Sequence, residues 1–284
     1  MRFNWVTLPV SMVALALAQP ALGASSPALQ AIEQQLQGLV STKSADVGIA
    51  AIDLATGENI NVKGNTPFPM ASTMKIAVAA SYLAQVDHGR RSLGDSIGKS
   101  TARAQLERMM IHSDNAATDR LIHNLGGPKA IQDFLDFHRV SGMRVDRNIA
   151  QLLKDPRDLW DRRDSSTPLA MAQFLRRLDR EAILSPSSRA VLFDMMRRCE
   201  TGKNRMKALL PADAQVQHKT GTLNGYTSDV GYISLPDGRR VALAIFARGG
   251  ADRPRTIAEA ARTLYDGFRS VITWNFRPPL TSGQ

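Results

Sequence analysis

A serine and a lysine, Ser72 and Lys75, stand three positions apart at the start of an apolar run. A serine hydroxyl attacks a carbonyl carbon poorly unless a nearby base takes its proton, and a lysine amine can be that base when its charge is destabilised. Residues three apart share one face of a helix, which brings the amine within reach of the hydroxyl oxygen. Free N–H groups at a helix start can also stabilise charge on the attacked oxygen. The pair therefore predicts a nucleophilic serine and its base.

The same Ser-x-x-Lys spacing occurs again at Ser96 and Lys99, so the spacing alone is not specific. Context separates the two copies. The first leads into the apolar run 76–83 at an expected helix start, whereas the second lies in a segment rich in Gly and Ser. We therefore assign the nucleophile to Ser72.

A second string, Ser113-Asp114-Asn115, combines a hydroxyl, a carboxylate and an amide. The hydroxyl of Ser113 can relay a proton between the lysine and a leaving nitrogen, and the amide of Asn115 can hold a substrate carbonyl. Asp114 is better suited to stabilising the turn. The string predicts a proton relay beside a substrate-binding group.

A third string, Lys219-Thr220-Gly221-Thr222, falls on an expected strand. Lys219 and Thr220 would bind a substrate carboxylate by charge and hydroxyl, and Gly221 would let the backbone approach closely. Thr222 would supply a second N–H for the oxyanion. Taken in order, the three strings predict a serine acyl enzyme.

Hydrophobic patterns predict the elements that position these groups. Strands are expected at 47–53 and 59–63 near the start of the chain, and at 215–221, 227–235 and 241–246 near its end. The intervening patterns are mostly helical. We predict an α/β (α+β) fold in which an antiparallel sheet flanked by helices is built from both chain ends, with an inserted all-helical lobe. The expected boundaries are 24–65 and 206–284 for the α/β lobe and 66–205 for the helical lobe.

Residues 1–23 differ from the rest of the chain. Arg2 is their only charge, the run that follows is apolar, and small residues end it at 21–23. This pattern is typical of a cleaved secretory signal peptide. We expect an exported protein, periplasmic or secreted, with no stable membrane anchor after cleavage.

The formal net charge is +10, and removal of Arg2 with the signal lowers it by one. The basic residues are scattered without interleaved aromatics, which favours a solvated basic surface over nucleic-acid binding. Cys199 is the sole cysteine, which rules out an intramolecular disulfide, and the five histidines show no metal-ligand spacing. We expect no cofactor, no metal, no nucleic-acid partner and a monomer.

The three strings resemble the active-site motifs of serine β-lactamases and penicillin-binding D,D-peptidases. Their order and spacing are most similar to class A β-lactamases, and the likeness covers most of the chain after residue 23. The stretches 144–147 and 163–168 resemble the two ends of the class A omega loop. The resemblance implies that Arg147 and Asp164 form the ion pair that clamps this loop.

One departure from class A bears on function. Class A enzymes carry a Glu-x-x-Leu-Asn string soon after the first loop arginine, and its glutamate activates the water that hydrolyses the acyl enzyme. Here the stretch after Arg147 reads Asn-Ile-Ala-Gln-Leu-Leu, and no glutamate occurs between Glu107 and Glu181. Asp155 or Asp158 could replace it only if its shorter side chain reached the water.

A second departure concerns the arginine that often helps to hold the substrate carboxylate in this family. Ser228 occupies one expected strand position, which leaves Arg253 or Arg255 as candidates. The segment between the first two motifs is also short, which predicts a more open cleft.

We therefore expect an exported serine hydrolase that is acylated at Ser72 by β-lactams or by peptides ending in D-Ala-D-Ala. Without the loop glutamate, D,D-peptidase-like action with slow β-lactam release is favoured. The alternatives are a working β-lactamase with another base, a protein that binds cell-wall fragments without turnover, and an esterase or amidase acting on an unrelated metabolite.

Overall fold

The computed structural model describes residues 26–180 and 183–275. The predicted signal at 1–23 therefore lies outside the described residues. One five-stranded antiparallel sheet forms the centre of the molecule, with strand order β2-β1-β9-β8-β7. Its strands are β1 (Asp46–Asp53), β2 (Asn59–Val62), β7 (Val216–Leu223), β8 (Tyr226–Ser234) and β9 (Arg240–Arg248).

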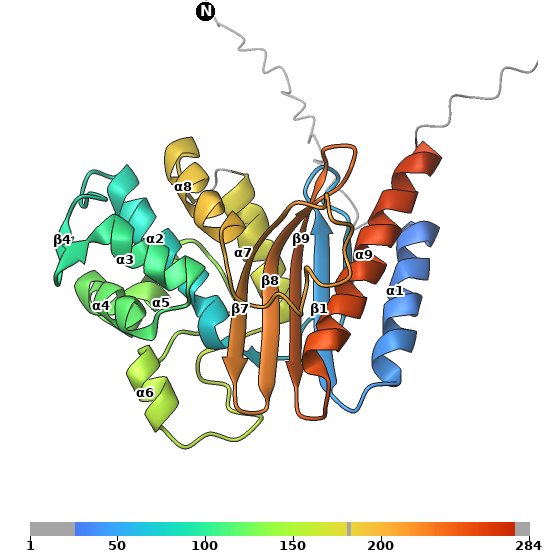
Figure 1. The fold of residues 1–284 in the computed structure, drawn as a ribbon, viewed down its shortest axis with the longest axis horizontal. Helices are drawn as coiled ribbons and strands as arrows, with labels where there is room; N and C mark the ends of the chain where they lie inside the picture. The colour runs from blue at the N-terminus through green and yellow to red at the C-terminus, as the bar shows by residue number, and fades with distance from the viewer. Residues whose placement is uncertain (1–25, 181–182, 276–284) are drawn as a thin grey trace, which may run out of the picture.

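The sheet joins the two ends of the chain. Along β1, residues from Asp46 to Asp53 pair in antiparallel register with residues from Arg248 to Val241 of β9. Strand β1 also pairs with β2, so it is hydrogen-bonded on both edges. The predicted α/β fold, with an antiparallel sheet from both chain ends and helices inserted between them, is confirmed (Figure 1).

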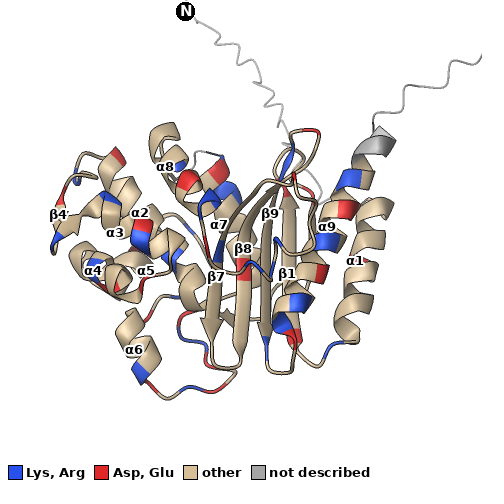
Figure 2. Cartoon of the chain, viewed as in Figure 1, with Lys and Arg blue, Asp and Glu red and all other residues tan. Residues whose placement is uncertain are grey.

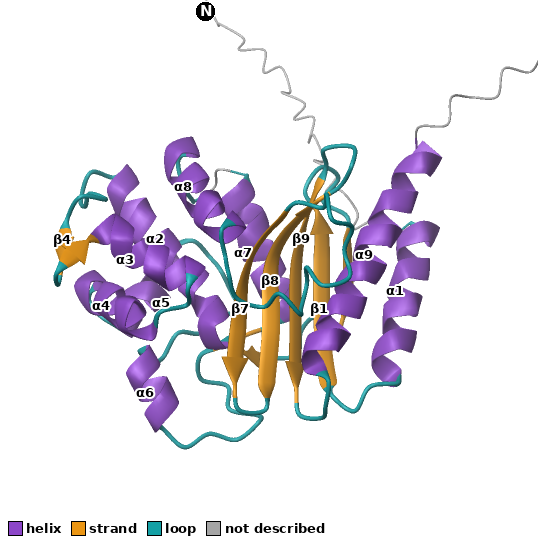
Figure 3. Ribbon diagram, viewed as in Figure 1, coloured by secondary structure: helices purple, strands orange, loops and turns teal. Residues whose placement is uncertain are grey.

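Helices lie on both faces of this sheet (Figure 3). The helices are α1 (Pro27–Ser41), α2 (Lys75–Asp87), α3 (Ala102–Ile111), α4 (Asn115–Leu125), α5 (Pro128–Phe137), α6 (Ile149–Lys154), α7 (Pro168–Asp179), α8 (Pro186–Arg197) and α9 (Arg253–Asn275), with a 3₁₀ turn η1 (Ala71–Met74) directly before α2. Two short ladders pair β3 (Phe68–Pro69) with β6 (Ser165–Ser166) and β4 (Ser96–Ile97) with β5 (Ser100–Thr101).

Alternation along the strands gives the sheet two buried faces. In β1, Ile49 packs with α1 and α9, whereas Ile52 packs with the core formed by the inserted helices. In β9, Leu243 and Ala244 divide in the same way. Because successive strand side chains point to opposite faces, both faces of a central strand can be apolar only when both are covered. The inserted helices therefore complete the sheet's second core.

Two local expectations need correction. The segment 146–164 has no clean helical or strand period, which predicts a long ordered loop, but it contains α6, which begins with a capping box formed by Asn148 and Gln151. Six helical residues are too few to show a hydrophobic period, so the sequence pattern does not reveal this helix. Ser72 lies in the 3₁₀ turn η1 rather than in the α-helix, which begins at Lys75.

Charged residues are spread over both halves of the fold (Figure 2). Lys and Arg occur together with Asp and Glu on helices and loops rather than on a single face of one element. No helix among the described residues is long and apolar enough to cross a membrane.

Candidate active site

The turn that carries Ser72 packs tightly against β7. Ala71, directly before the serine, has φ of 49°, in the left-handed region. A Cβ placed on Gly221 would lie 2.5 Å from the Met70 carbonyl oxygen and 2.4 Å from the Ser228 hydroxyl. Only glycine allows this approach, so Gly221 fixes the distance between the strand and the Ser72 turn. The sequence predicts that Gly221 lets the backbone approach closely, and the structure shows this close approach.

Lys75 sits at the centre of a hydrogen-bonded cluster. Its Nζ lies 2.7 Å from the carbonyl oxygen of Ser113, 3.2 Å from the Ser113 hydroxyl and 2.8 Å from Oδ1 of Asn115. The side chain is fully buried. Burial, together with the nearby charge of Lys219, lowers the pKa of Lys75 to about 7, although Asp114 and Asp119 oppose the shift. A substantial fraction of this amine is therefore neutral near pH 7 and can accept a proton.

Ser113 lies between two lysines. Lys219 Nζ donates to its hydroxyl oxygen at 3.0 Å, and Lys75 Nζ lies 3.2 Å from the same oxygen. The φ of Ser113 is 60°, a left-handed conformation that turns the chain between α3 and α4. Asp114 caps α4 through the N–H of Ala117 at 2.8 Å, which agrees with its expected structural role. The turn therefore delivers the hydroxyl to both amines.

Lys219 is buried beside this hydroxyl on β7. Burial lowers the pKa of Lys219 to about 8, and the nearby Cys199 and Asp229 oppose that shift. Its Nζ also donates to the carbonyl of Thr220 at 3.2 Å, and the Thr220 hydroxyl lies 2.5 Å from that of Thr201. Lys219 is thus mostly cationic at neutral pH while Lys75 is partly neutral.

Arg205 is a site residue that the sequence analysis missed. Its Nη1 donates to the carbonyls of Gly221 and Ser228 at 3.0 Å each, and its Nη2 donates to the Thr222 hydroxyl at 2.6 Å. This arrangement places the Arg205 guanidinium directly beside Gly221 and Thr222 of β7. The segment that carries Arg205 has no strand or helix pattern, so only the fold reveals its position.

The two arginines proposed from sequence have other partners. Arg253 Nη1 donates to the carbonyls of Gly249 and Gly250 at 2.8 and 2.6 Å. Arg255 pairs with Glu259 on α9 at 2.9 Å. Arg253 reaches β8 through Thr227 at 3.3 Å, whereas Arg205 contacts Thr222 itself. Arg205 therefore fits a carboxylate-binding position better than either.

A buried histidine–aspartate pair joins β7 to β8 directly next to Lys219. His218 Nδ1 is 2.7 Å from Oδ1 of Asp229, and both side chains are fully buried. Although burial opposes it, the Asp229 carboxylate raises the pKa of His218 to about 9. Burial alone would raise the pKa of the Cys199 thiol, but His218 and Lys219 lower it to about 6. The strand that presents Lys219 is thus anchored by a charged pair on its other side.

The omega-loop ends are joined by the expected ion pair. Arg147 Nε donates to Oδ2 of Asp164 at 2.6 Å, and both residues are buried. Oδ1 of Asp164 accepts the backbone N–H groups of Asp146 and Arg147 at 2.8 and 2.9 Å. The predicted clamp is confirmed, and one carboxylate holds both ends of the loop.

The carboxylates inside the loop are already engaged. Asp155 pairs with Arg147 at 3.3 Å, and Asp161 pairs with Arg163 at 2.8 Å. The carboxylate of Asp158 accepts the N–H of Trp160 at 2.7 Å. Within the part of the chain that the structure describes, no Asp or Glu makes a hydrogen bond or ion pair with Ser72, Lys75 or Ser113.

The described residues also contain no group of three or more His, Cys, Asp or Glu that could hold a metal ion. The site therefore offers hydroxyls, amines and a guanidinium for chemistry. These are the groups of an acyl-transfer enzyme that uses serine as nucleophile.

Comparisons with known proteins agree with this geometry. Residues 31–268 match the model of the "Beta-lactamase enzyme family". The extended-spectrum beta-lactamase PER-1 of Pseudomonas aeruginosa is 31% identical over 262 residues, covering 81% of this chain and 84% of that protein. The carbapenem-hydrolyzing beta-lactamase KPC of Klebsiella oxytoca is 27% identical, covering 78% of this chain and 84% of that protein.

Solved structures show the same fold. An ancestral class A beta-lactamase has 33% identity and a TM-score of 0.79, with 84% of this chain and all of that chain covered. A beta-lactamase from Chitinophaga pinensis has 27% identity and a TM-score of 0.78, with 84% and 99% covered. The fold and site define a serine hydrolase of the class A β-lactamase type. The chain belongs to the beta-lactamase enzyme family.

Proposed function

We propose that this enzyme forms an ester at Ser72 with β-lactams or with peptides ending in D-Ala-D-Ala, and that it releases β-lactams slowly, as a D,D-peptidase does. The observation that carries the proposal is the contrast around Lys75. This amine has a pKa of about 7 and hydrogen bonds with Ser113, while no carboxylate of the described residues bonds to the cluster. Such a site is equipped for acylation but lacks an evident base for hydrolysis.

Acylation follows from the groups present. Neutral Lys75 accepts the proton of Ser72 as its oxygen attacks the carbonyl carbon, and the carbonyl π electrons move to the oxygen. Backbone N–H groups of Ser72 and Thr222 stabilise that oxyanion. As the C–N bond breaks, Ser113 delivers a proton to the leaving nitrogen and recovers one from Lys75. The product is an acyl ester on Ser72, with the proton balance closed.

Substrate binding uses the groups along β7. Lys219 and Thr220 would hold the substrate carboxylate, and Arg205 would add a second positive charge beside Thr222. Asn115 would hold the amide carbonyl next to the reacting bond. A terminal carboxylate is shared by penicillins and by D-Ala-D-Ala peptides, so these contacts suit both.

Slow deacylation is proposed from the chemistry of the loop. Hydrolysis of the ester needs a base within hydrogen-bond reach of a water, and general-base catalysis contributes roughly 10²–10⁴-fold. Asp155 and Asp158, the two carboxylates considered as substitutes, are engaged with Arg147 and with the Trp160 N–H. Engaged carboxylates are poor bases for this water.

A working β-lactamase is the second candidate. It is favoured by the names of the relatives, which include an extended-spectrum beta-lactamase 31% identical to this chain. In that case Lys75, after passing its proton to the leaving nitrogen, would be the remaining base for water. A cell-wall-fragment binding protein without turnover is disfavoured, because Lys75, Ser113, Asn115 and Lys219 are joined in one hydrogen-bonded cluster.

Export and a monomeric state are part of the proposal. Export rests on the composition of residues 1–23 and on the D-Ala-D-Ala peptides of the cell wall as substrate. Cleavage of the first 23 residues is expected when the full chain is expressed in a bacterium with a secretion pathway.

Intact-mass spectrometry tests the proposed function. The mature protein and Ser72→Ala are sampled over time after addition of a penicillin, with the free product followed in parallel. A long-lived adduct on the wild type alone supports D,D-peptidase-like action. Rapid product release with little adduct favours the β-lactamase candidate. The absence of both adduct and product would overturn penicillin recognition.

A further inference from the structure

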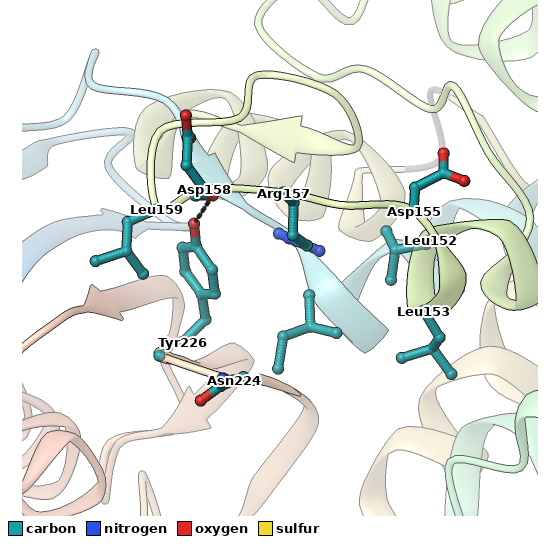
Figure 4. Close-up of a pocket in the computed structure, with 10 residues that line it drawn as sticks. Leu152, Leu153, Asp155, Arg157, Asp158, Leu159, Asn224 and Tyr226 are labelled. Atoms are coloured by element: carbon teal, nitrogen blue, oxygen red, sulfur yellow. Dashed lines mark hydrogen bonds between the residues drawn. The ribbon is translucent and has the colours of Figure 1, made fainter.

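A cavity of about 520 Å³ lies between the omega loop and the β7–β8 hairpin (Figure 4). Leu223, which directly follows Thr222 on β7, lines this cavity, so the cavity adjoins the site described above. Its walls are formed in part by Leu152, Leu153, Leu159, Asn224 and Tyr226. The cavity is thus mostly apolar, and its charged groups come from the loop.

Arg157 is the unusual member of this lining. Its three guanidinium nitrogens are buried, and none has a hydrogen-bond partner among the described residues. One of its contacts is with the ring of Tyr226, whose centre lies 5.0 Å from the guanidinium carbon. The Tyr226 hydroxyl is itself engaged, because it donates to the carbonyl of Asp158 at 2.6 Å. A guanidinium has five N–H donors, and leaving them unused in a buried place is costly.

The loop's own carboxylates do not neutralise this cation. Asp155 pairs with Arg147 at 3.3 Å, and Asp158 accepts the N–H of Trp160 at 2.7 Å. In Figure 4 both carboxylates point away from the Arg157 guanidinium. Arg147 and Arg163, two other arginines of the loop, both form ion pairs within it. Arg157 therefore has a buried guanidinium that faces a cavity and lacks an anion.

We infer that this cavity is a subsite for a carboxylate on the acyl part of the substrate. The planar guanidinium would bind that carboxylate through two parallel N–H···O bonds, and the leucine walls would cover the carbon chain that leads to it. The inference rests on the proposed function and narrows its substrate class. The substrate has two carboxylates, one beside Lys219 and Arg205 and a second that reaches Arg157.

In a peptide substrate, the second carboxylate belongs to a side chain on the amino-terminal side of the bond that is cut. In a penicillin, it belongs to an acidic acylamino side chain. Substrates with a neutral side chain of the same length would leave Arg157 unpaired and would lose this interaction.

The test compares two penicillins of matched length, one with an adipoyl side chain and one with a neutral hexanoyl side chain. The rate constant for acylation of Ser72 is measured for each by intact-mass spectrometry of the mature protein. We expect the wild type to prefer the adipoyl compound about tenfold, the size typical of a charge-assisted hydrogen bond. In Arg157→Gln the ratio should fall to about one, and Arg157→Lys should retain part of it.

Arg162→Gln is the matched control. Arg162 lies in the same loop and is exposed, and it does not line the cavity, so removing its charge should leave the ratio unchanged. Equal rates for the two penicillins in the wild type would overturn the subsite while leaving the proposed function intact. So would a ratio that survives in Arg157→Gln or falls equally in Arg162→Gln. Failure of both penicillins to acylate Ser72 would overturn the proposed function and this inference with it.

Discussion

The Lys75 cluster and the omega loop use charge in opposite ways. In the cluster, two buried lysines share the Ser113 hydroxyl without a carboxylate in hydrogen-bond contact, and both pKa values fall. In the loop, Arg147 is surrounded by Asp155, Asp161 and Asp164; although burial opposes the shift, Asp164 and Asp155 raise the pKa of Arg147.

The charges of the Lys75 cluster are therefore suited to catalysis, and those of the omega loop to stability. An amine near neutrality can exchange protons during catalysis, whereas a fully paired guanidinium only holds its neighbours. Arg157 belongs to neither group, because it lies in the loop but is unpaired. The contrast therefore identifies Arg157 as a loop cation whose buried guanidinium is available to bind a ligand.

The largest expected effect comes from removing the base of the cluster. Lys75→Ala should slow acylation of Ser72 by roughly 10³-fold, within the range of general-base catalysis. The control is Lys99→Ala, which alters the second Ser-x-x-Lys copy at an exposed position and should leave the rate unchanged. Acylation is measured by intact mass against time. A similar loss in both variants, or none in Lys75→Ala, would show that the cluster does not activate the serine.

The next largest effect should come from the loop and should appear in stability. Asp164→Asn removes the buried partner of Arg147 and should lower the free energy of unfolding by about 3–5 kcal/mol. Urea denaturation measures the change. Asp133→Asn, which alters the exposed Lys129 pair, should cost well under about 1 kcal/mol. Equal losses in the two variants would mean that the loop clamp is not a special source of stability.

The smallest expected effect is a shift in the pH dependence of acylation. Lys75 must lose its proton to act as base, so the rate should rise through about pH 7. Lys219 must keep its charge to bind the substrate carboxylate, so the rate should fall above about pH 8. The charge of Lys219 lowers the pKa of Lys75, and Lys219→Gln should therefore move the rising limb to higher pH. Rates across pH 5–10 test this, and an unmoved limb would show that the lysines are not coupled.

Much of the fold could be predicted from the sequence, because the strands and long helices have clear periods. The expected strand at 227–235 is found as β8 at Tyr226–Ser234, and Thr167 caps α7 with Pro168 in the first turn. The 3₁₀ turn at Ser72 and the short helix α6 were missed, since elements of four to six residues carry no readable period.

Part of the active site could also be predicted, because several of its residues occur in short recognisable strings. The three strings carry their own chemistry, so Lys75, Ser113 and Lys219 were identified before their contacts were known. Arg205 and Arg157 were not identified, because each matters through neighbours that are distant in sequence. Arg205 is identified by its hydrogen bonds to β7, and Arg157 by the lack of hydrogen-bond partners for its guanidinium among the described residues.

The pairing of β1 with β9 also sets the order in which the chain can fold. Asp46 and Arg248, which face each other across these strands and form an ion pair, are 202 positions apart. During synthesis the inner edge of β1 has no strand to pair with until nearly the whole chain has been made. Contacts of such long separation slow folding, because a large loop must close before they form. The chain therefore spends its early life incompletely folded, and substitutions in β9 should affect its folding rate more than those in α3.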